Sequence, residues 1–345
     1  MSRQVTLRDP RFDGVKSAIT FGFTSGSPES RSWAVGRWGE AGPPTVIEKA
    51  EVPAIGIAEM DDADTVGLID RQLFASVRER AALFRLRGFR RAGFRVRTIT
   101  MGGTTVAWVE EGKAIPVLSP SFDNVGLTPS KLAGISVWTK ESLAQVPGIE
   151  QLVYDDLARA YAEAVDLALF DVDNDGSGGA PAAITNGAPA TAATGDLAND
   201  LAALYSTFTG NLGAAYFASS PETAASLAAT ELGREVGARG GELAGVPVLT
   251  SQGIPPGQLT LVDPTALLVA FDEDLELATS RHGTVEMLDA TLTGDSIAVV
   301  PGTAASTVPL WQANSVSIRA IGRVAWTMGR TGAVSTLTGL EPVAS

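Results

Sequence analysis

The chain of 345 residues contains no cysteine, which excludes disulfide bonds and metal sites built from thiolates. It contains a single histidine, His282, so it has little capacity for acid–base or metal chemistry. Its formal net charge is −13, and the overall basic character typical of nucleic-acid-binding proteins is therefore absent. No uncharged apolar run is long enough to cross a bilayer, and the first ten residues lack the apolar core of a signal peptide. We therefore expect a soluble protein from a reducing compartment, with no contact with a membrane.

The composition nevertheless indicates a folded protein. Hydrophobic residues make up 45% of the chain and the mean hydropathy is +0.14, well outside the range of disordered proteins. A chain of this length can bury two or three hydrophobic cores. The 37 glycines and 19 prolines predict many turns and extended segments.

The strongest local signal lies in residues 148–180. Apolar residues recur every three or four positions, which predicts one long amphipathic helix over residues 148–170. At about 1.5 Å per residue this helix would be roughly 34 Å long. The glycine-rich sequence at 171–179 (DVDNDGSGG) is expected to end it. The predicted buried stripe consists of Ile149, Leu152, Leu157, Ala160, Tyr161, Ala164, Ala168 and Phe170.

The segment before residue 61 shows little periodicity and contains many glycines and prolines. Alone it would be a flexible arm, and we expect it to become ordered by lying on another surface, such as a neighbouring copy of the chain.

Residues 65–83 predict an amphipathic helix with Asp64 as its N-cap. This helix leads into a run that is unusually rich in arginine for an acidic protein. Arginines at this density can bind nucleic-acid phosphates, acidic faces of neighbouring copies or a scaffold, or simply form a solvated helix end. The negative net charge favours contacts with neighbouring copies. The run comprises Arg78, Arg80, Arg85, Arg87, Arg90, Arg91, Arg95 and Arg97.

Residues 93–140 are predicted to be extended. Polar and apolar residues alternate on both sides of Gly102-Gly103, which indicates a hairpin with strands at 95–101 and 104–109. Two further strands are expected at 122–127 and 132–138, and a short helical turn at 139–142 leads into the long helix.

Helices and strands alternate in the second half of the chain, and strands dominate after residue 275. Residues 181–194 and 232–242 are predicted to be loops. Helices are predicted at 196–208 and at 219–230, the second opening with a capping box from Ser219 to Glu222. The predicted strands are 214–219, 246–250, 259–263, 267–271, 284–288 and 316–328.

Four segments, in this order along the chain, carry a distinctive pattern. The first is 107–112 (AWVEEG) with Pro116, Ser119, Phe122, Leu127, Lys131 and Leu132. The second is Ser142-Leu143 with the long helix, 175–178, Pro181 and Ile184. The third is 243–248 with Ser251 and 261–263. The fourth is Trp311, Gln312, Asn314, Val316, 318–320 and Arg323. Together they resemble the major capsid proteins of tailed bacteriophages with the Hong Kong 97-like fold. The first segment is similar to the extended loop of that family, and the second to its spine helix with the following loop. The third is similar to its central domain, and the fourth to its return strands.

This resemblance implies an α+β fold with a Hong Kong 97-like organisation. An N-terminal arm would cover residues 1–64. The first part of a peripheral domain would cover 65–194, with an extended E-loop hairpin at about 93–127 and a spine helix at 148–170. An A-domain would cover 195–282. The return strands of the peripheral domain and the C-terminus would cover 283–345.

The resemblance also implies a structural function and no enzymatic one. The chain would assemble as homo-hexamers and homo-pentamers into the icosahedral shell of a tailed phage, in the cytoplasm of the bacterial host. Separate scaffolding and portal proteins, and in some phages decoration proteins, would be its partners. The shell would enclose double-stranded DNA without sequence-specific binding, and the acidic charge would let the DNA slide during packaging. No catalytic, cofactor or metal residue is expected.

Three features suggest other roles, and each has a simpler explanation. The spacing of Asp171, Asp173 and Asp175 before Gly176 copies the start of an EF-hand calcium loop, but its twelfth position is Ala182 instead of glutamate. A polar helix terminator is the favoured interpretation. His282 fits an ordinary surface histidine. Lys113 lies where some family members form an isopeptide cross-link, but an exposed loop lysine is favoured because no acceptor can be identified.

Two alternative functions remain open at the level of sequence. An encapsulin-type or gene-transfer-agent shell would have the same fold but a different content. A soluble calcium-binding or hydrolytic protein that uses residues 171–176 would instead form a small oligomer with calcium-dependent stability.

Overall fold

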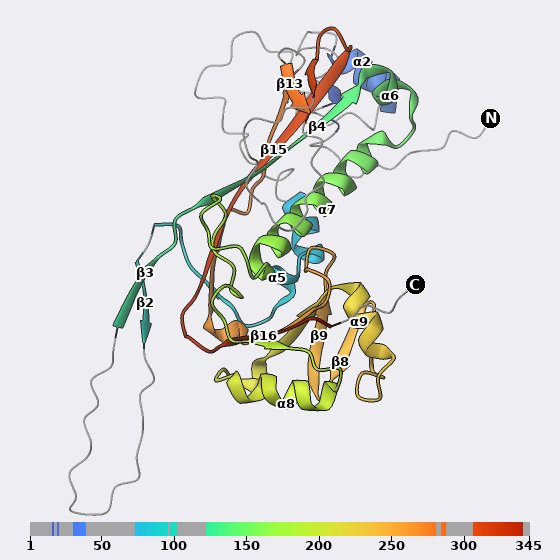
Figure 1. The fold of residues 1–345 in the computed structure, drawn as a ribbon. Helices are drawn as coiled ribbons and strands as arrows, with labels where there is room; N and C mark the ends of the chain where they lie inside the picture. The colour runs from blue at the N-terminus through green and yellow to red at the C-terminus, as the bar shows by residue number, and fades with distance from the viewer. Residues whose placement is uncertain are drawn as a thin grey trace, which may run out of the picture.

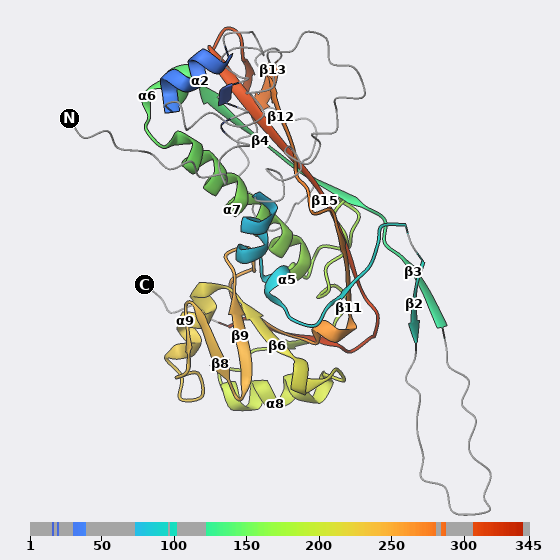
Figure 2. The same cartoon turned by 180° about the vertical axis from the view of Figure 1, so that it is seen from behind.

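The computed structural model describes residues 16, 19–20, 30–38, 73–95, 97–101, 122–280, 284–287 and 306–340. Two sheets and one long helix organise these residues (Figures 1 and 2). The α+β class expected from the sequence is confirmed. Within the described residues, no helix combines the length and apolar character needed to span a membrane.

The long helix α7 (Ile149–Phe170) lies along a five-stranded sheet. It begins after Gly148, whose φ of 76° belongs to the left-handed region that glycine adopts easily. The helix was predicted correctly, but its buried face was only partly predicted. Leu152 is 54% exposed, and Ala160 is also exposed, whereas Val153, Val165 and Leu169 face the core instead.

The sheet beside α7 is built around one strand, β15 (Ser315–Met328). Its first ten residues pair with β4 (Ser130–Thr139) in an antiparallel ladder. Two shorter strands, β11 (Leu267–Phe271) and β12 (Glu276–Ser280), also pair antiparallel with β15, while β1 (Arg90–Arg91) pairs parallel with β11. Even-numbered residues of β15 such as Ile318 face the core shared with α7, whereas Arg319 and Arg323 are exposed.

A second, seven-stranded sheet lies at the C-terminal end of α7 (Figure 1). Its core includes side chains of the helices α8 (Leu197–Thr207) and α9 (Pro221–Ala228). Its strands, in spatial order, are β5 (Ala190–Ala192), β16 (Val334–Thr338), β10 (Gln258–Val262), β6 (Tyr216–Ser219), β9 (Val246–Thr250), β8 (Gly240–Leu243) and β7 (Val236–Gly237).

The remaining described elements are short. A two-stranded hairpin, β2 (Arg97–Met101) with β3 (Phe122–Gly126), projects from the body of the molecule (Figure 2). Another pair consists of β13 (Thr284–Met287) and β14 (Ser306–Pro309). Helix α6 (Lys140–Gln145) begins with Thr139 as its cap, and α2 (Ser30–Trp38) lies near it. Two single turns of 3-10 helix, η3 (Leu212–Ala214) and η4 (Pro264–Ala266), complete the set.

Several sequence predictions need correction. The predicted loops at 181–194 and 232–242 contain β5 and the β7–β8 hairpin, whose glycines concealed its extended pattern. The strands β1, β12, β14 and β16 were not predicted. The cap of α9 is Ser220, whose Oγ accepts the N–H of Thr223, so the capping box read from Ser219 was displaced by one residue.

The helix predicted at 65–83 differs from the observed one. Residues 73–80 are helical, the chain breaks at Ala81, and α5 (Ala82–Arg85) follows. The break has a tertiary cause, because the side chain of Asp166 on α7 accepts the N–H groups of Ala82 and Leu83. Residues 64–72 lie outside the described part of the chain.

The N-terminal segment packs on its own subunit more than expected. Ile19 and Ala34 are fully buried, and Trp33 and Trp38 pack against the core around α7. Arg37 donates to the carbonyl oxygens of Leu143 and Val146. The interpretation of this segment as an arm without self-packing is therefore wrong for α2, while the rest of residues 1–64 lies largely outside the described residues.

Prediction: replacing Ala244 by asparagine should stabilise the chain. Ala244 and Gly245 form the two-residue turn between β8 and β9, and both have positive φ, 50° and 81°. Such turns favour Asn-Gly, and a left-handed residue other than glycine costs about 1–2 kcal/mol. We expect the free energy of unfolding in urea to rise by about 0.5–1 kcal/mol. Ala229→Asn, at an exposed residue with ordinary φ, is the control, and an equal gain there would contradict the explanation.

Candidate assembly surfaces

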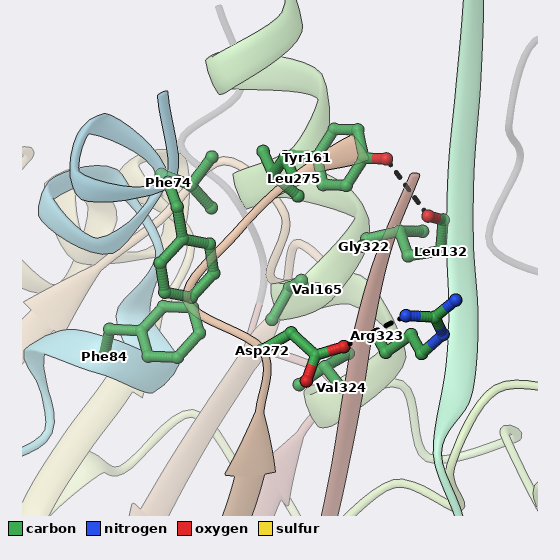
Figure 3. Close-up of a pocket in the computed structure, with 11 residues that line it drawn as sticks. Phe74, Phe84, Leu132, Tyr161, Val165, Asp272, Leu275, Gly322, Arg323 and Val324 are labelled. Atoms are coloured by element: carbon green, nitrogen blue, oxygen red, sulfur yellow. Dashed lines mark hydrogen bonds and ion pairs between the residues drawn. The ribbon is translucent and has the colours of Figure 1, made fainter. Parts of the chain in front are cut away.

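A small cavity lies between α7, the helical residues 73–80 and the five-stranded sheet (Figure 3). Its volume is about 20 Å³, enough for roughly one water molecule. Its lining is mostly apolar, and its two charged side chains, Asp272 and Arg323, are paired with each other at 3.3 Å. Tyr161 also lines it, and the Tyr161 hydroxyl donates to the carbonyl oxygen of Leu132 at 3.0 Å. The cavity therefore offers a substrate neither room nor a free acid or base.

The aspartate-rich loop after α7 is a structural stop. Three of its side chains each accept a hydrogen bond from the backbone N–H group two residues later. Asp171 accepts from Asp173, Asn174 from Gly176, and Asp175 from Ser177. Asn174 also donates to the carbonyl oxygens of Ala168 and Pro181, which ties the loop to the helix end. Such Asx turns satisfy the backbone locally and engage these oxygens in the loop's own hydrogen bonds.

No grouping of three or more acidic or histidine side chains able to hold a metal ion occurs in the part of the chain that the structure describes. The polar-terminator interpretation of residues 171–176 agrees with this geometry. His282 and Lys113 lie outside the described residues.

The arginine run divides into paired and exposed members. Arg80 forms an ion pair with Asp155 of α7 at 2.6 Å, and Arg85 donates to the carbonyl oxygen of Thr250 at 2.8 Å. Arg78 lies over the ring of Phe271. These three arginines therefore stabilise the subunit itself, a role that differs from the predicted contact with neighbouring copies.

Arg90 and Arg91 are neighbours in β1 with different surroundings. The Arg91 guanidinium pairs with Glu273 at 2.5 Å and lies 4.5 Å from the ring centroid of Phe271. Phe271 is itself packed on Phe74 and Phe84. Both arginines are exposed, but these contacts belong to Arg91, so Arg90 is the one available to a neighbouring molecule.

The hairpin β2–β3 projects from the body of the molecule (Figure 2). Among the described strands, β2 and β3 pair only with each other, in five consecutive pairs from Arg97–Gly126 to Met101–Phe122. An isolated two-stranded hairpin is at best marginally stable in water. Residues 102–121, which join the two strands, lie outside the described residues, as does the strand predicted at 104–109.

A turn with an exposed tryptophan joins β14 to β15. Trp311 is 75% exposed, the largest exposed fraction among the bulky hydrophobic side chains of the described residues. In this turn Asn314 has a φ of 47°, its side chain donates to Glu141 at 2.7 Å, and its carbonyl oxygen accepts the N–H of Lys140. Hydrogen bonds from its own backbone amide and from Asn314 lower the pKa of Glu141. Tryptophan is enriched among the residues that contribute most to protein–protein contacts.

Comparison with known proteins identifies the family. Residues 68–334 match the family model described as "Phage capsid family". The chain belongs to the phage capsid family.

One curated family relative is the "Capsid polyprotein" of Pseudomonas phage PAJU2, which is 30% identical over 274 residues. The matched region is 73% of this chain but only 40% of that relative, so the chain spans well under half of the relative's length.

Solved phage structures share the fold. A chain from Mycobacterium phage Adephagia has a TM-score of 0.52 at 15% identity, with 83% of this chain and 98% of that chain covered. A chain from Gordonia phage Cozz has a TM-score of 0.50 at 15% identity, with 75% and 86% covered. The predicted Hong Kong 97-like capsid fold is therefore confirmed.

Sequence reasoning missed two residues of interest. Trp311 was noted only as part of a family-like motif, although an aromatic residue in a turn signal was a hint of exposure. Asp166 was not singled out, although it is a lone acidic residue within the apolar stretch AVDLALF. The structure buries it completely.

Prediction: Arg91→Glu should destabilise the subunit, and Arg90→Glu should not. The first change removes the ion pair and the contact with Phe271 and places two glutamates side by side, which together cost about 1–2 kcal/mol. The exposed neighbour Arg90 is the matched control. Urea unfolding of the soluble subunit measures both, and equal losses would contradict the intramolecular role of Arg91.

Proposed function

We propose that this chain is the major capsid protein of a tailed phage. Copies would associate as homo-hexamers and homo-pentamers into an icosahedral shell around double-stranded DNA, in the cytoplasm of the bacterial host. Membership of the phage capsid family is the single observation that carries this proposal. The chain would act structurally, without catalysis, cofactor or metal.

The geometry supports the proposal because several elements lack sufficient burial within one subunit. In the described part of the chain, the hairpin β2–β3 pairs with no third strand, and Trp311 and Arg90 are exposed. A neighbouring copy that covered them would add buried area and hydrogen bonds, so assembly would stabilise the fold. We assign contacts between copies to these three features.

The expected division of the chain also remains a proposal. The five-stranded sheet with α7 fits the peripheral domain of 65–194 and 283–345, and the seven-stranded sheet fits the A-domain of 195–282. Four strands cross this division. The strands β11 and β12, within 195–282, belong to the five-stranded sheet, whereas β5 and β16, outside that range, belong to the seven-stranded sheet. Scaffolding, portal and decoration proteins would be separate partners.

The acidic charge would suit the inside of a shell that stores DNA. At −13 per chain, the protein would not hold phosphates tightly, and DNA could slide during packaging. Binding of naked DNA to assembled shells is then expected to be weak and nearly independent of salt concentration.

Prediction: the purified chain should form closed particles visible by negative-stain electron microscopy. Particles isolated from a phage lysate should contain DNA that is protected from nuclease. Protein cargo in place of DNA would favour an encapsulin-type shell, and transfer of random host DNA would favour a gene-transfer agent. A monomer or small oligomer whose stability depends on calcium would contradict the proposal, and gel filtration with and without a chelator detects that outcome.

A further inference from the structure

Asp166 is a fully buried carboxylate near the C-terminal end of α7. Three donors point at it: the N–H of Ala82 at 2.7 Å, the N–H of Leu83 at 3.1 Å and the hydroxyl of Ser251 at 2.5 Å. The first two belong to α5, and Ser251 belongs to the turn that follows β9. One side chain therefore joins the long helix, the segment that leads to the projecting hairpin, and the seven-stranded sheet.

The contacts around Asp166 form a tight junction. The guanidinium of Arg85, on α5, donates to the carbonyl oxygen of Thr250 at the end of β9. Gly253 packs directly on α7, where a Cβ atom would overlap the carbonyl oxygen of Glu163 and lie 2.9 Å from the Cβ of Asp166. Ile254 is 1% exposed and adds a buried apolar side chain to this junction. Water can reach the carboxyl group only if these elements separate.

Few charges act on Asp166 in this junction. From α5, Arg85 faces it and favours its ionised form. From α7, Glu163 lies one helical turn earlier, and the turn at 250–254 (TSQGI) contributes no charged side chain. Burial raises the pKa of Asp166 to about 6, and this effect outweighs the hydrogen bonds from Ser251, Ala82 and Leu83 and the charge of Arg85, which all lower it.

We propose that Asp166 is a proton-sensitive latch of this junction. The junction is tightest while the carboxyl group is protonated, and it opens to water more readily once the group is ionised. The site also accommodates the protonated form, because a protonated carboxyl group keeps acceptor capacity for the donors of α5 and Ser251.

The direction follows from linkage. The ordinary pKa of 3.8 applies in an open, hydrated junction, and about 6 applies in the closed one. The closed form therefore binds the proton more tightly, and its advantage is complete below about pH 4 and lost as the pH rises through about 6. The difference of about two pKa units corresponds to an opening equilibrium that increases by up to about 100-fold.

The latch has a consequence for assembly that rests on the proposed function. In a shell, the pH would change how tightly the seven-stranded sheet packs on α7 and on the segment that leads to the hairpin. The proposed latch acts within one subunit. Its test can therefore fail while the proposed capsid function remains supported.

Prediction: amide hydrogen exchange at the junction should depend on pH through Asp166. Exchange of the full chain is followed by mass spectrometry from pH 4 to 8, after correction for the intrinsic pH dependence of exchange. Peptides that cover residues 82–83 and 246–256 should lose up to about 100-fold protection as the pH rises from about 4 to about 6.

Matched variants decide the outcome. Glu163→Gln, which removes the preceding carboxylate on α7, should keep the pH dependence, and Asp166→Asn should abolish it. A wild-type profile without pH dependence, or an unchanged dependence in Asp166→Asn, would overturn the proposal. If Asp166→Asn does not fold, Ser251→Ala provides the test, because loss of this donor should extend the loss of protection to higher pH. An unchanged pH range would contradict the latch.

Discussion

The packing of α7 against the five-stranded sheet is the interaction on which the rest of the structure depends. Apolar residues of the helix, among them Val153, Leu157 and Leu169, share one core with β15 and with helical residues 73–80. At about 25 cal/mol per Å² of apolar surface removed from water, this contact supplies the main driving force for folding the subunit. The sheet alone would be narrow, and the helix alone would expose a broad apolar face.

Polar contacts at the end of α7 add to the apolar packing that attaches the seven-stranded sheet to this unit. At the C-terminal end of α7, Gln258 and Thr185 both donate to the carbonyl oxygen of Phe170. Their bonds satisfy a helix-end carbonyl that would otherwise be unpaired, and they join the seven-stranded sheet to the helix. Asp166 makes a similar connection one turn earlier. The helix is therefore both the core of one layer and the support of the other.

The sequence predicted well what depends on local periodicity. The 22 residues of α7, the strand β15 and the helix α8 follow from patterns that a single segment contains. The exposure of Leu152 could not be predicted, because it depends on which neighbours reach each side of the helix. The break at Ala81 could not be predicted either, since its cause is the hydrogen bond between Ala82 and Asp166, which are 84 residues apart.

The assembly surfaces likewise combine features that the sequence shows with contacts that exist only in the folded chain. The density of arginines at 78–97 was visible, but their roles were not, because Glu273, Asp155 and Phe271 become their partners only in the folded chain. Short strands such as β16 carried too few residues for a clear alternation. Family resemblance supplied the fold correctly, while the assignment of individual contacts required the three-dimensional structure.

The central claim is that the extended parts of this chain complete their burial only on a neighbouring copy. Amide hydrogen exchange of the hairpin strands, Arg97–Met101 and Phe122–Gly126, compared between assembled particles and dissociated subunits, tests it most directly. We expect rapid exchange in the subunit and strong protection in the particle, while α7 is protected in both. Equal exchange of the hairpin in the two states would contradict the claim.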